Sequence, residues 1–309
     1  MPELPLDQVR TLLAAVDEGT FDAAARSLHV TPSAVSQRVK ALEQRVGRVL
    51  LLRTKPVQLT DSGEVVVRFA RQLALLERDA GAELGVAGAV SVVPIAVNAD
   101  SLATWLLPAL AEIPEQTGFE ICFDLHREDQ DHTTLLLRQG LVMAAVTSSP
   151  EPVQGCSVRR LGRMRYHAMA TRQFAERWLT AGPLRQTLVD APVVVFDRKD
   201  DLQDQFLRGL APRRAAGSTS VTAPGAARRH YIPASEAFVE AVAAGLGWGM
   251  VPEAQAAQRP EGELTHLAPD RPIDVPLYWQ QWKLDSPALA AVSDAVLRTA
   301  ARALAGSGS

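Results

Sequence analysis

Short apolar stripes separated by breaks fill the first sixty residues, as in a small helical domain. An amphipathic helix is predicted over residues 4–19, because apolar side chains recur there at three- and four-residue steps: Leu6, Val9, Leu12, Leu13 and Val16. Residues 22–28 predict a second, short helix, and a third is expected from Ser33 to about Val46. Residues 49–52 and 57–59 then predict two short strands that form a hairpin.

A long amphipathic helix is expected next, over about Asp61–Leu84, with Thr60 as its cap. At about 1.5 Å per residue this helix would be roughly 35 Å long. Since a solitary helix of that length needs a partner for its apolar stripe, we expect the chain to form a dimer. The stripe has the spacing of a coiled-coil seam and comprises Val66, Phe69, Leu73, Leu76 and Ala80.

From residue 89 on, predicted strands alternate with predicted helices. This alternation is typical of a mostly parallel sheet flanked by helices, and about 215 residues indicate two such subdomains with a cleft between them. Pro108 is expected to kink the first helix. The strands are expected at 90–97, 120–125, 142–146, 165–170, 192–196, 250–252 and 276–282, and the helices at 102–113, 133–139, 173–179, 235–244 and 288–304.

The composition is that of an ordinary globular protein, with 309 residues, 47% hydrophobic and 22% charged. Two cysteines, Cys122 and Cys156, without a CxxC motif exclude a zinc finger, an iron–sulfur ligand set and a disulfide scaffold. We therefore expect no metal and no cofactor. No apolar run is long enough to cross a membrane, and the first residues do not resemble a signal peptide, so we expect a cytoplasmic protein.

Charge is distributed unevenly along the chain. The net charge is −3, which by itself argues against a nucleic-acid binder. However, residues 20–58 contain seven cations and two anions, whereas residues 61–309 contain 24 cations and 29 anions. A basic N-terminal region on an acidic body indicates that one small region meets a polyanion.

The third predicted helix has one face suited to reading DNA. Val35, Val39, Leu42 and Val46 form its apolar stripe, so the opposite face points outward. That outward face carries hydroxyls, amides and one cation but no carboxylate, and glutamine is well shaped for adenine in a major groove. A solvated face of a small helical domain is the alternative interpretation. The outward residues are Ser33, Ser36, Gln37, Lys40 and Gln44.

The hairpin and the turn before the helix extend this surface. Arg53 and Lys55 at the basic hairpin tip would contact the DNA backbone or minor groove. Together with the Thr31-Pro32 turn, the pattern indicates a winged helix-turn-helix. The predicted DNA-binding residues are Thr31, Pro32, Ser33, Ser36, Gln37, Arg38, Lys40, Arg53 and Lys55.

At these residues the sequence resembles a known family. The stretch Phe21–Glu43, FDAAARSLHVTPSAVSQRVKALE, is similar to the N-terminal signature of LysR-type transcriptional regulators. The stretches Val97–Leu110, Ala191–Asp197 and Ser235–Val239 are similar to the ArgP/LysG branch, also described as the chromosome-initiation-inhibitor group. The resemblance covers the whole chain and implies a winged domain, a linker helix and a two-lobed α/β effector domain similar to periplasmic binding proteins.

The resemblance also implies a division of the chain and a set of partners. It assigns residues 1–60 to DNA binding, 61–88 to the linker and dimerisation helix, and 89–305 to effector binding. Within the last region, lobe I covers about 89–163 and 270–305, and lobe II about 164–269. The branch implies regulators that sense lysine or arginine and control a basic amino-acid exporter. We expect a dimer or tetramer on an interrupted palindromic operator in double-stranded DNA, with RNA polymerase as a further candidate partner.

Polar residues at the ends of predicted strands form a candidate effector site. A helix start at Asn98–Ser101 offers N–H groups and a hydroxyl to a ligand carboxylate, and acids nearby suit an ammonium or guanidinium group. For each residue singly, a helix cap, a turn or a solvated loop remains the alternative. The predicted effector-binding residues are Asn98, Asp100, Ser101, Glu128, Asp129, Thr147, Ser148, Asp197 and Ser235.

Two other classes of function remain open at this point. The chain could be an enzyme with binding-protein-like lobes, although it contains no GxSxG, P-loop or HExxH motif and no other nucleophile–base constellation. It could also be an architectural DNA-binding protein without a small-molecule response. Trp105, Trp279 and Trp282 are interpreted as core residues, and the glycine-rich Gly245–Gly249 as turns that end a helix.

Overall fold

The computed structural model describes residues 4–84, 91–113, 121–127, 130–210 and 228–305. Its contacts divide the chain into two compact units. The first unit contains the chain up to Val97, Glu112–Arg159 and Trp279–Ala295. The second contains Asn98–Ala111, Arg160–Tyr278 and the chain from Val296 on. Three elements have residues in both units, namely β6 (Cys156–Ala170), β11 (Ile273–Trp282) and α14 (Pro287–Ala303).

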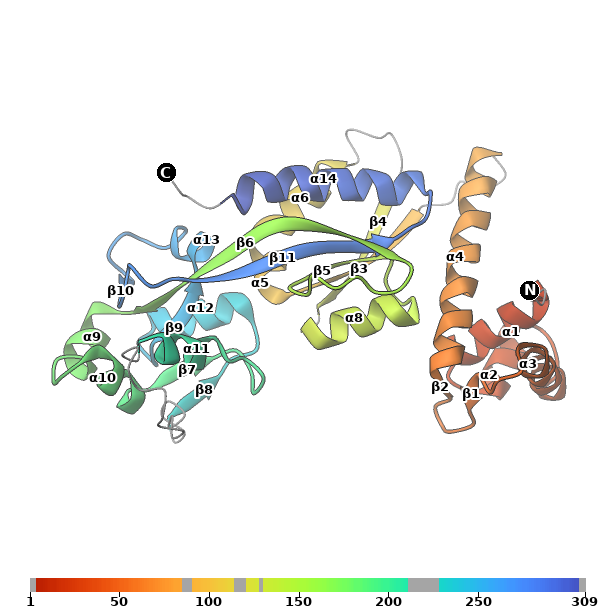
Figure 1. Cartoon of the computed structure of the whole chain (residues 1–309), viewed down its shortest axis with the longest axis horizontal. Helices are drawn as coiled ribbons and strands as arrows, with labels where there is room; N and C mark the ends of the chain where they lie inside the picture. Colours follow the sequence, from red (N-terminus) through yellow and green to blue (C-terminus); the bar gives the residue numbers. More distant parts are fainter. Residues whose placement is uncertain (1–3, 85–90, 114–120, 128–129, 211–227, 306–309) are drawn as a thin grey trace. The chain divides into compact units, whose positions relative to one another are not determined.

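The N-terminal part of the first unit has the predicted order of elements (Figure 1). Helices α1 (Leu6–Asp17), α2 (Phe21–Ser27) and α3 (Pro32–Val46) pack on one another. They precede a hairpin of β1 (Leu51–Leu52) and β2 (Gln58–Leu59), whose strands are antiparallel. The predicted winged helix-turn-helix is therefore confirmed.

Threonine caps and one glycine fix the ends of these helices. Thr20, Thr31 and Thr60 each accept the backbone N–H three residues further on, at 3.1–3.2 Å, and so begin α2, α3 and the following helix α4. Such caps satisfy N–H groups that have no partner within the helix. Gly47 ends α3 with φ of 72°, a left-handed conformation that glycine adopts without steric cost.

The long helix α4 (Asp61–Glu83) has one face buried in the helical domain and another that exposes apolar side chains. Val66, Val67 and Ala70 are buried in the core of the helical domain. The predicted seam is therefore wrong at Val66, because the first turns of α4 complete that core. The exposed apolar stripe instead begins at Val65 and continues through Phe69 and Leu76, which are 51%, 39% and 41% exposed.

The rest of the first unit is built on a parallel sheet. Strand β3 (Ser91–Val97) pairs in parallel with β4 (Ile121–Arg127) on one side and β5 (Ala144–Thr147) on the other. Helix α8 (Gln130–Gln139) packs against β5. The strand–helix alternation thus predicts this sheet correctly, including its parallel direction.

The second unit mixes parallel and antiparallel pairs. Strand β6 pairs antiparallel with β9 (Gly249–Pro252) and β10 (Thr265–His266), whereas β7 (Val193–Val195) and β8 (Arg229–Tyr231) are parallel. The strand predicted over 165–170 is longer, because β6 begins at Cys156. Its first part alternates buried and exposed residues with several arginines, which hides it from a search for apolar runs.

Helices surround these strands. Helix α12 (Ser235–Ala243) contributes Phe238 and Val242 to a core that also contains Val251 of β9. The described residues of this unit form four further helices between β6 and β10, three of which, α10, α11 and α13, have no counterpart in the sequence prediction. These four are α9 (Arg172–Trp178), α10 (Leu184–Asp190), α11 (Leu202–Gly209) and α13 (Glu253–Ala256).

The helix predicted over 102–113 contains an irregularity where a kink is expected. A short helix α5 (Ala99–Ser101) continues into a π-helical turn (Leu102–Leu106) and then into α6 (Leu107–Ala111). Pro108 lacks an N–H and its ring would crowd the carbonyl four residues earlier. The wider π turn that immediately precedes it is a known way to accommodate such a break.

The contact between Gly63 and the hairpin gives a stability prediction. A Cβ atom at Gly63 would lie 2.0 Å from the carbonyl oxygen of Leu50, so Gly63→Ala must displace the backbone of the hairpin. We expect a loss of about 1–3 kcal/mol in the free energy of unfolding of this domain. Gly81→Ala in the same helix meets nothing within 4 Å and should stabilise by roughly 0.5–1 kcal/mol. Urea titrations followed by circular dichroism measure both, and equal stabilities of the two variants would contradict this account.

Candidate functional site

The outward face of α3 is polar and accessible. Val35, Val39 and Leu42 are buried in the core of the helical domain. On the opposite side, the predicted DNA-binding residues are at the surface, as the helical spacing requires. Thr31, Pro32, Ser33, Gln37 and Lys40 are exposed, and Ser36 and Arg38 are half-buried.

Glu43 is the one carboxylate of α3 close to the outward face, and its side chain points away from that face. Glu43 Oε1 accepts the backbone N–H groups of Leu50 and Leu51, at 2.9 and 3.3 Å. The negative charge is therefore held against the hairpin, where it anchors β1. This interaction leaves hydroxyl, amide and cationic groups at the outward face, a combination suited to phosphates and base edges.

Arg53 and Lys55 lie in the hairpin loop and are both exposed. The guanidinium of Arg53 lies over the ring of Phe21, with 5.7 Å between the guanidinium carbon and the ring centroid. This cation–π contact holds the side chain against α2 while leaving its donors open to a partner. The structure thus places both predicted hairpin cations at the surface of the helical domain.

A buried carboxylate is the centre of a polar cluster in the second unit. The hydroxyl of Tyr166 on β6 donates to Asp100 Oδ2 at 2.6 Å. The hydroxyl of Ser235, the first residue of α12, donates to Asp100 Oδ1 at 2.5 Å. Asp100 and Ser235 are 135 residues apart in the chain, and the fold brings these two predicted site residues together.

Gln255 on α13 completes this cluster. Its Oε1 lies 3.1 Å from Ser235 Oγ, which has already given its only hydrogen to Asp100. Rotation of the amide would let Gln255 donate to the serine oxygen, an assignment that the heavy atoms alone leave equivalent. The cluster of Asp100, Tyr166, Ser235 and Gln255 thus holds one carboxylate in place by neutral groups.

Burial changes the acidity of this cluster. Burial raises the pKa of Asp100 above its usual range, while the hydrogen bonds from Ser235 and Tyr166 act in the opposite direction and the charge of Glu236 adds to the increase. Burial also raises the pKa of Tyr166, and the neighbouring Asp100 raises it further. Among the described residues, Asp100 forms no ion pair with an arginine, lysine or histidine. A buried carboxylate of this kind lacks the counter-ion that its ionised form requires.

Two neighbours of Asp100 in sequence have buried polar atoms without a partner. Asn98 Oδ1 and Ser101 Oγ are both inaccessible and form no hydrogen bond with any residue that the structure describes. Asn98 precedes α5 but its side chain does not cap the helix. The predicted site residues in this stretch therefore hold unused acceptors and donors next to an unpaired carboxylate, which is typical of a binding site rather than of a simple helix cap.

The remaining predicted site residues do not join the Asp100 cluster. Asp197 Oδ1 accepts the N–H groups of Lys199 and Asp200, at 2.7 and 3.0 Å, so this acid shapes a turn. Thr147 ends β5 in the first unit and Ser148 follows it, and Thr147 Oγ1 accepts the N–H of Ser149. The predicted residues Glu128 and Asp129 lie outside the described residues.

The sequence did not identify Tyr166 and Gln255 as site residues. Tyr166 lies in an apolar strand and Gln255 in a short helix, so neither has a local signal. Asp200 is a further omission, because its charge contributes to the raised pKa of Tyr166. Only the tertiary fold brings Tyr166 to Asp100 and Gln255 to Ser235.

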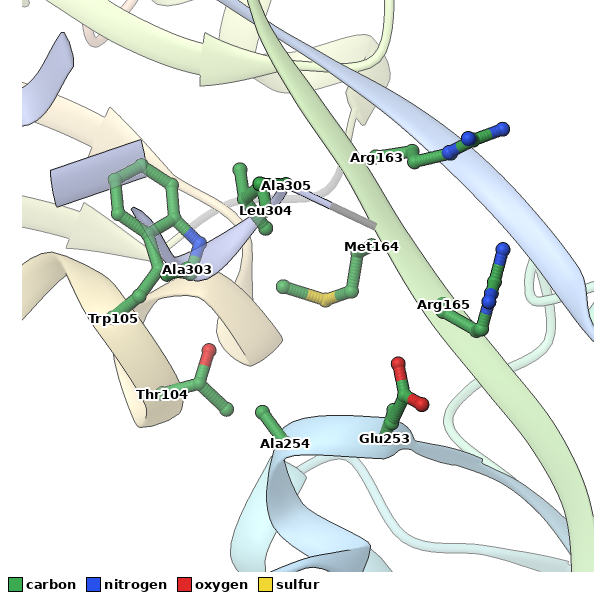
Figure 2. Close-up of a pocket in the computed structure, with 10 residues that line it drawn as sticks. All are labelled: Thr104, Trp105, Arg163, Met164, Arg165, Glu253, Ala254, Ala303, Leu304 and Ala305. Atoms are coloured by element: carbon green, nitrogen blue, oxygen red, sulfur yellow. The ribbon is translucent and has the colours of Figure 1, made fainter. Parts of the chain in front are cut away.

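A pocket of about 210 Å³ lies within the second unit (Figure 2). The π-helical turn, β6, α13 and the end of α14 line it. Met164 and Leu304 supply apolar surface and Glu253 supplies a carboxylate, whereas Figure 2 shows the guanidinium groups of Arg163 and Arg165 pointing away from Met164 and Trp105. Trp105 is 4% exposed, and its indole nitrogen is buried and has no hydrogen-bond partner. In Figure 2 this nitrogen is on the side of the ring that faces Ala303 and the pocket.

The described residues offer few other sites. They contain no group of three or more histidine, cysteine or acidic side chains arranged to hold a metal ion. Within the same residues, no helix has both the length and the apolar character that a bilayer crossing requires. Gly247 lies close to the backbone of Pro192 and leads into β9, which agrees with the interpretation of the glycine-rich stretch as turns.

Comparisons with known proteins agree with this arrangement. The regulator LysG of Mycobacterium tuberculosis strain H37Rv is 46% identical over 308 residues, covering 98% of this chain and 95% of that protein. The lysine export transcriptional regulatory protein LysG of Corynebacterium glutamicum is 43% identical over 299 residues, covering 96% and 98%. The full-length structure of Corynebacterium glutamicum LysG with bound effector arginine has a TM-score of 0.82 at 41% identity, covering 96% of this chain and 98% of that one.

Two protein families match most of the chain. Residues 6–64 match the family described as bacterial regulatory helix-turn-helix protein, lysR family. Residues 89–301 match the LysR substrate binding domain. These matches confirm the resemblance of the sequence to LysR-type regulators and, through the relatives named LysG, to their ArgP/LysG branch. The chain belongs to the LysR family of bacterial helix-turn-helix transcriptional regulators.

Proposed function

We propose that this regulator senses lysine or arginine and controls the transcription of a basic amino-acid exporter. Relatives at 43–46% identity support this, since one of them is named a lysine export regulator and a solved relative holds arginine as effector. In this division of labour, residues 1–60 bind DNA, 61–88 link and dimerise, and 89–305 bind the effector.

The DNA contacts follow from the exposed face of α3 and the hairpin. Ser33, Gln37 and Lys40 approach base edges and phosphates in a major groove, while Arg53 and Lys55 contact the backbone or minor groove. Thr31, Pro32, Ser36 and Arg38 border this surface. Two copies, joined along the exposed stripe of α4, present two such faces to an interrupted palindrome.

The observation that carries amino-acid sensing is the buried Asp100 carboxylate without a cation. An ammonium or guanidinium group of the effector supplies the missing counter-ion, with Tyr166 and Ser235 holding the carboxylate in position. The unused atoms of Asn98 and Ser101 provide further polar partners for the ligand. Effector binding favours one arrangement of the effector region, which changes how the two DNA-binding domains are spaced.

A promoter-binding experiment tests the proposal directly. The full chain is mixed with its own upstream region and with the promoter of a neighbouring exporter gene, with and without lysine, arginine and an uncharged amino acid such as glutamine. We expect a specific complex whose affinity or footprint changes with lysine or arginine only. Binding that is unaffected by either cation would contradict the sensing role, and absence of any complex at low salt would contradict the DNA-binding role.

Gln37→Ala and Arg53→Ala should affect DNA binding in different ways. Gln37 contacts bases, so its loss should reduce the preference for operator over random DNA by about 1–3 kcal/mol. Arg53 contacts phosphate, so its loss should weaken binding to all sequences and reduce the slope of log K against log salt by about 0.9. Fluorescence anisotropy at several salt concentrations measures both. Identical behaviour of the two variants would argue against these roles.

Leu76→Glu should disrupt dimerisation through α4. This change places a charge in the exposed apolar stripe, and burying that charge against a partner should raise the dimer dissociation constant by at least about tenfold. Arg78→Glu puts the same residue on another face of the helix and should leave the dimer intact. Sedimentation analysis at micromolar concentration compares them, and equal dimer populations would exclude this stripe as the interface.

Asp100→Asn should reduce the affinity for lysine or arginine about ten- to a hundredfold, because it removes the charged acceptor. The raised pKa of Asp100 also gives a pH dependence. At lower pH the free carboxyl holds a proton that the cation must displace, so wild-type affinity should rise with pH until the carboxyl is ionised. Calorimetry from roughly pH 5 to pH 8 should reveal this rise in the wild type and not in Asp100→Asn.

The control for this experiment is Asp190→Asn, the same substitution at an exposed acid of the second unit. It should retain both the affinity and the pH dependence of the wild type. If Asp100→Asn binds lysine and arginine as tightly as Asp190→Asn does, the effector cation is held elsewhere.

A further inference from the structure

Helix α4 has a polar side in addition to its buried face and its exposed apolar stripe. At about 100° per residue, Glu64, Arg68 and Arg71 lie within roughly 60° of one another on this helix. The exposed apolar stripe is centred roughly 100° away from them. Leu75 continues the polar side and is 2% exposed, although it is not part of the core of the helical domain. A further element must therefore cover this side of α4.

Helix α8, which belongs to the same unit as α4, ends against this polar side. The guanidinium of Arg71 donates to the backbone carbonyl oxygen of Gln139, at 2.9 Å. The side-chain amide of Gln139 donates to Glu64 Oε1, at 3.1 Å. Gln139 is the last residue of α8, so its carbonyl lacks a partner within the helix and a cation there is favourable. The C-terminal end of α8 is thus bound by side chains of α4.

The backbones of the two helices also approach each other closely. Gly140 follows α8 with φ of 72°, and a Cβ atom there would lie 2.9 Å from the Cα atom of Arg68. Arg68 is itself only 9% exposed. Burial raises the pKa of Cys156, at the start of β6, to about 11, and the charges of Arg68 and Lys283 act in the opposite direction. Glycine at position 140 therefore permits both the left-handed turn and the close contact with α4.

Arg71 contacts the DNA-binding helices as well. Its guanidinium donates to the carboxylate of Asp17, the last residue of α1, and its side chain is 16% exposed. Helix α1 in turn packs on α3, which carries the outward polar face. One largely buried guanidinium therefore joins the C-terminal end of α8 to the C-terminal end of α1.

We propose that this contact couples the effector-binding region to the DNA-binding domain within one chain, with Arg71 as the positioning residue. Helix α8 packs against β5, at whose end the predicted effector residues Thr147 and Ser148 lie, and it directly follows Glu128 and Asp129 in the sequence. Its 10 residues form a rod of roughly 15 Å. A change at one end of α8 therefore reaches α4 and α1 at the other. The role of lysine or arginine as its cause rests on the proposed function, whereas the coupling itself does not.

Gly140→Ala tests whether the contact forms in solution. The added Cβ must displace the backbone at Arg68, whereas Gly155→Ala, at another left-handed glycine with φ of 85°, meets nothing within 4 Å and is the matched control. We expect the amide hydrogens of α4 to exchange about three- to tenfold faster in full-length Gly140→Ala than in the wild type or the control. Hydrogen–deuterium exchange followed by mass spectrometry measures this difference.

Arg71→Gln tests the same contact from the other helix and leaves the turn after α8 intact. We expect the amide hydrogens of α8 to exchange faster by a similar factor in this variant. Arg78→Gln, the same substitution at an exposed arginine of α4, should leave α8 unchanged. An effect that crosses between the helices in both directions is not expected if each substitution only weakens its own helix.

The coupling is then tested by adding DNA to the wild type and the four variants. Because coupling between two sites is reciprocal, duplex DNA bound at α3 must alter α8. We expect a promoter fragment that the wild type binds to change the exchange of α8 at least about twofold in the wild type and both controls. In Gly140→Ala and Arg71→Gln it should leave α8 unchanged, while slower exchange of α3 shows that DNA is bound.

Two results would overturn the proposal. One is control-like exchange of α4 in Gly140→Ala and of α8 in Arg71→Gln, because the contact would then be absent in solution. The other is an α8 that ignores DNA in the wild type, or responds to it equally in Gly140→Ala and Arg71→Gln. If α8 responds to DNA as expected but lysine and arginine do not affect DNA binding, the coupling is supported and the proposed effector role is wrong.

Discussion

The hydrogen bonds from Tyr166 and Ser235 to Asp100 tie together three distant parts of the second unit. Helix α5, strand β6 and helix α12 meet at one carboxylate, and the two donors are neutral. Taking a carboxylate out of water is unfavourable unless hydrogen bonds and a counter-charge replace the lost hydration. The hydroxyls replace part of the hydration but not the charge. The proposed contact between Asp100 and the cationic group of an effector rests on this missing counter-charge.

In the DNA-binding domain the cations of the hairpin are exposed, and the carboxylate of Glu43 is held by backbone N–H groups. Glu43 is engaged by the backbone of β1, so the outward face of α3 presents only groups that phosphates and bases tolerate. The same interaction fixes the hairpin against α3. One carboxylate thus contributes both to the packing of the domain and to the charge of its surface.

The sequence predicts the elements whose signals are local. The cap at Thr60 and the apolar stripes of α1 and α3 all lie within a few residues of the structure they determine, and these predictions are confirmed. The parallel strands β3 to β5 are predicted for the same reason. Phe69 and Leu76 also lie on the exposed stripe of α4 as expected, whereas Val66 does not, because its environment depends on how α4 packs on α1.

The features that the sequence does not reveal depend on long-range contacts. Asp100 and Ser235 are predicted separately from their positions at element ends, but their hydrogen bond spans 135 residues. Tyr166 and Gln255 carry no local pattern that distinguishes them from core residues. The arginine-rich half of β6 looks like a loop because its outward side chains are charged, although β6 is a strand that lies beside β11 in the sheet. Local sequence signals predict where helices and strands begin and end. Which side chains meet at a site depends on how these elements pack against one another.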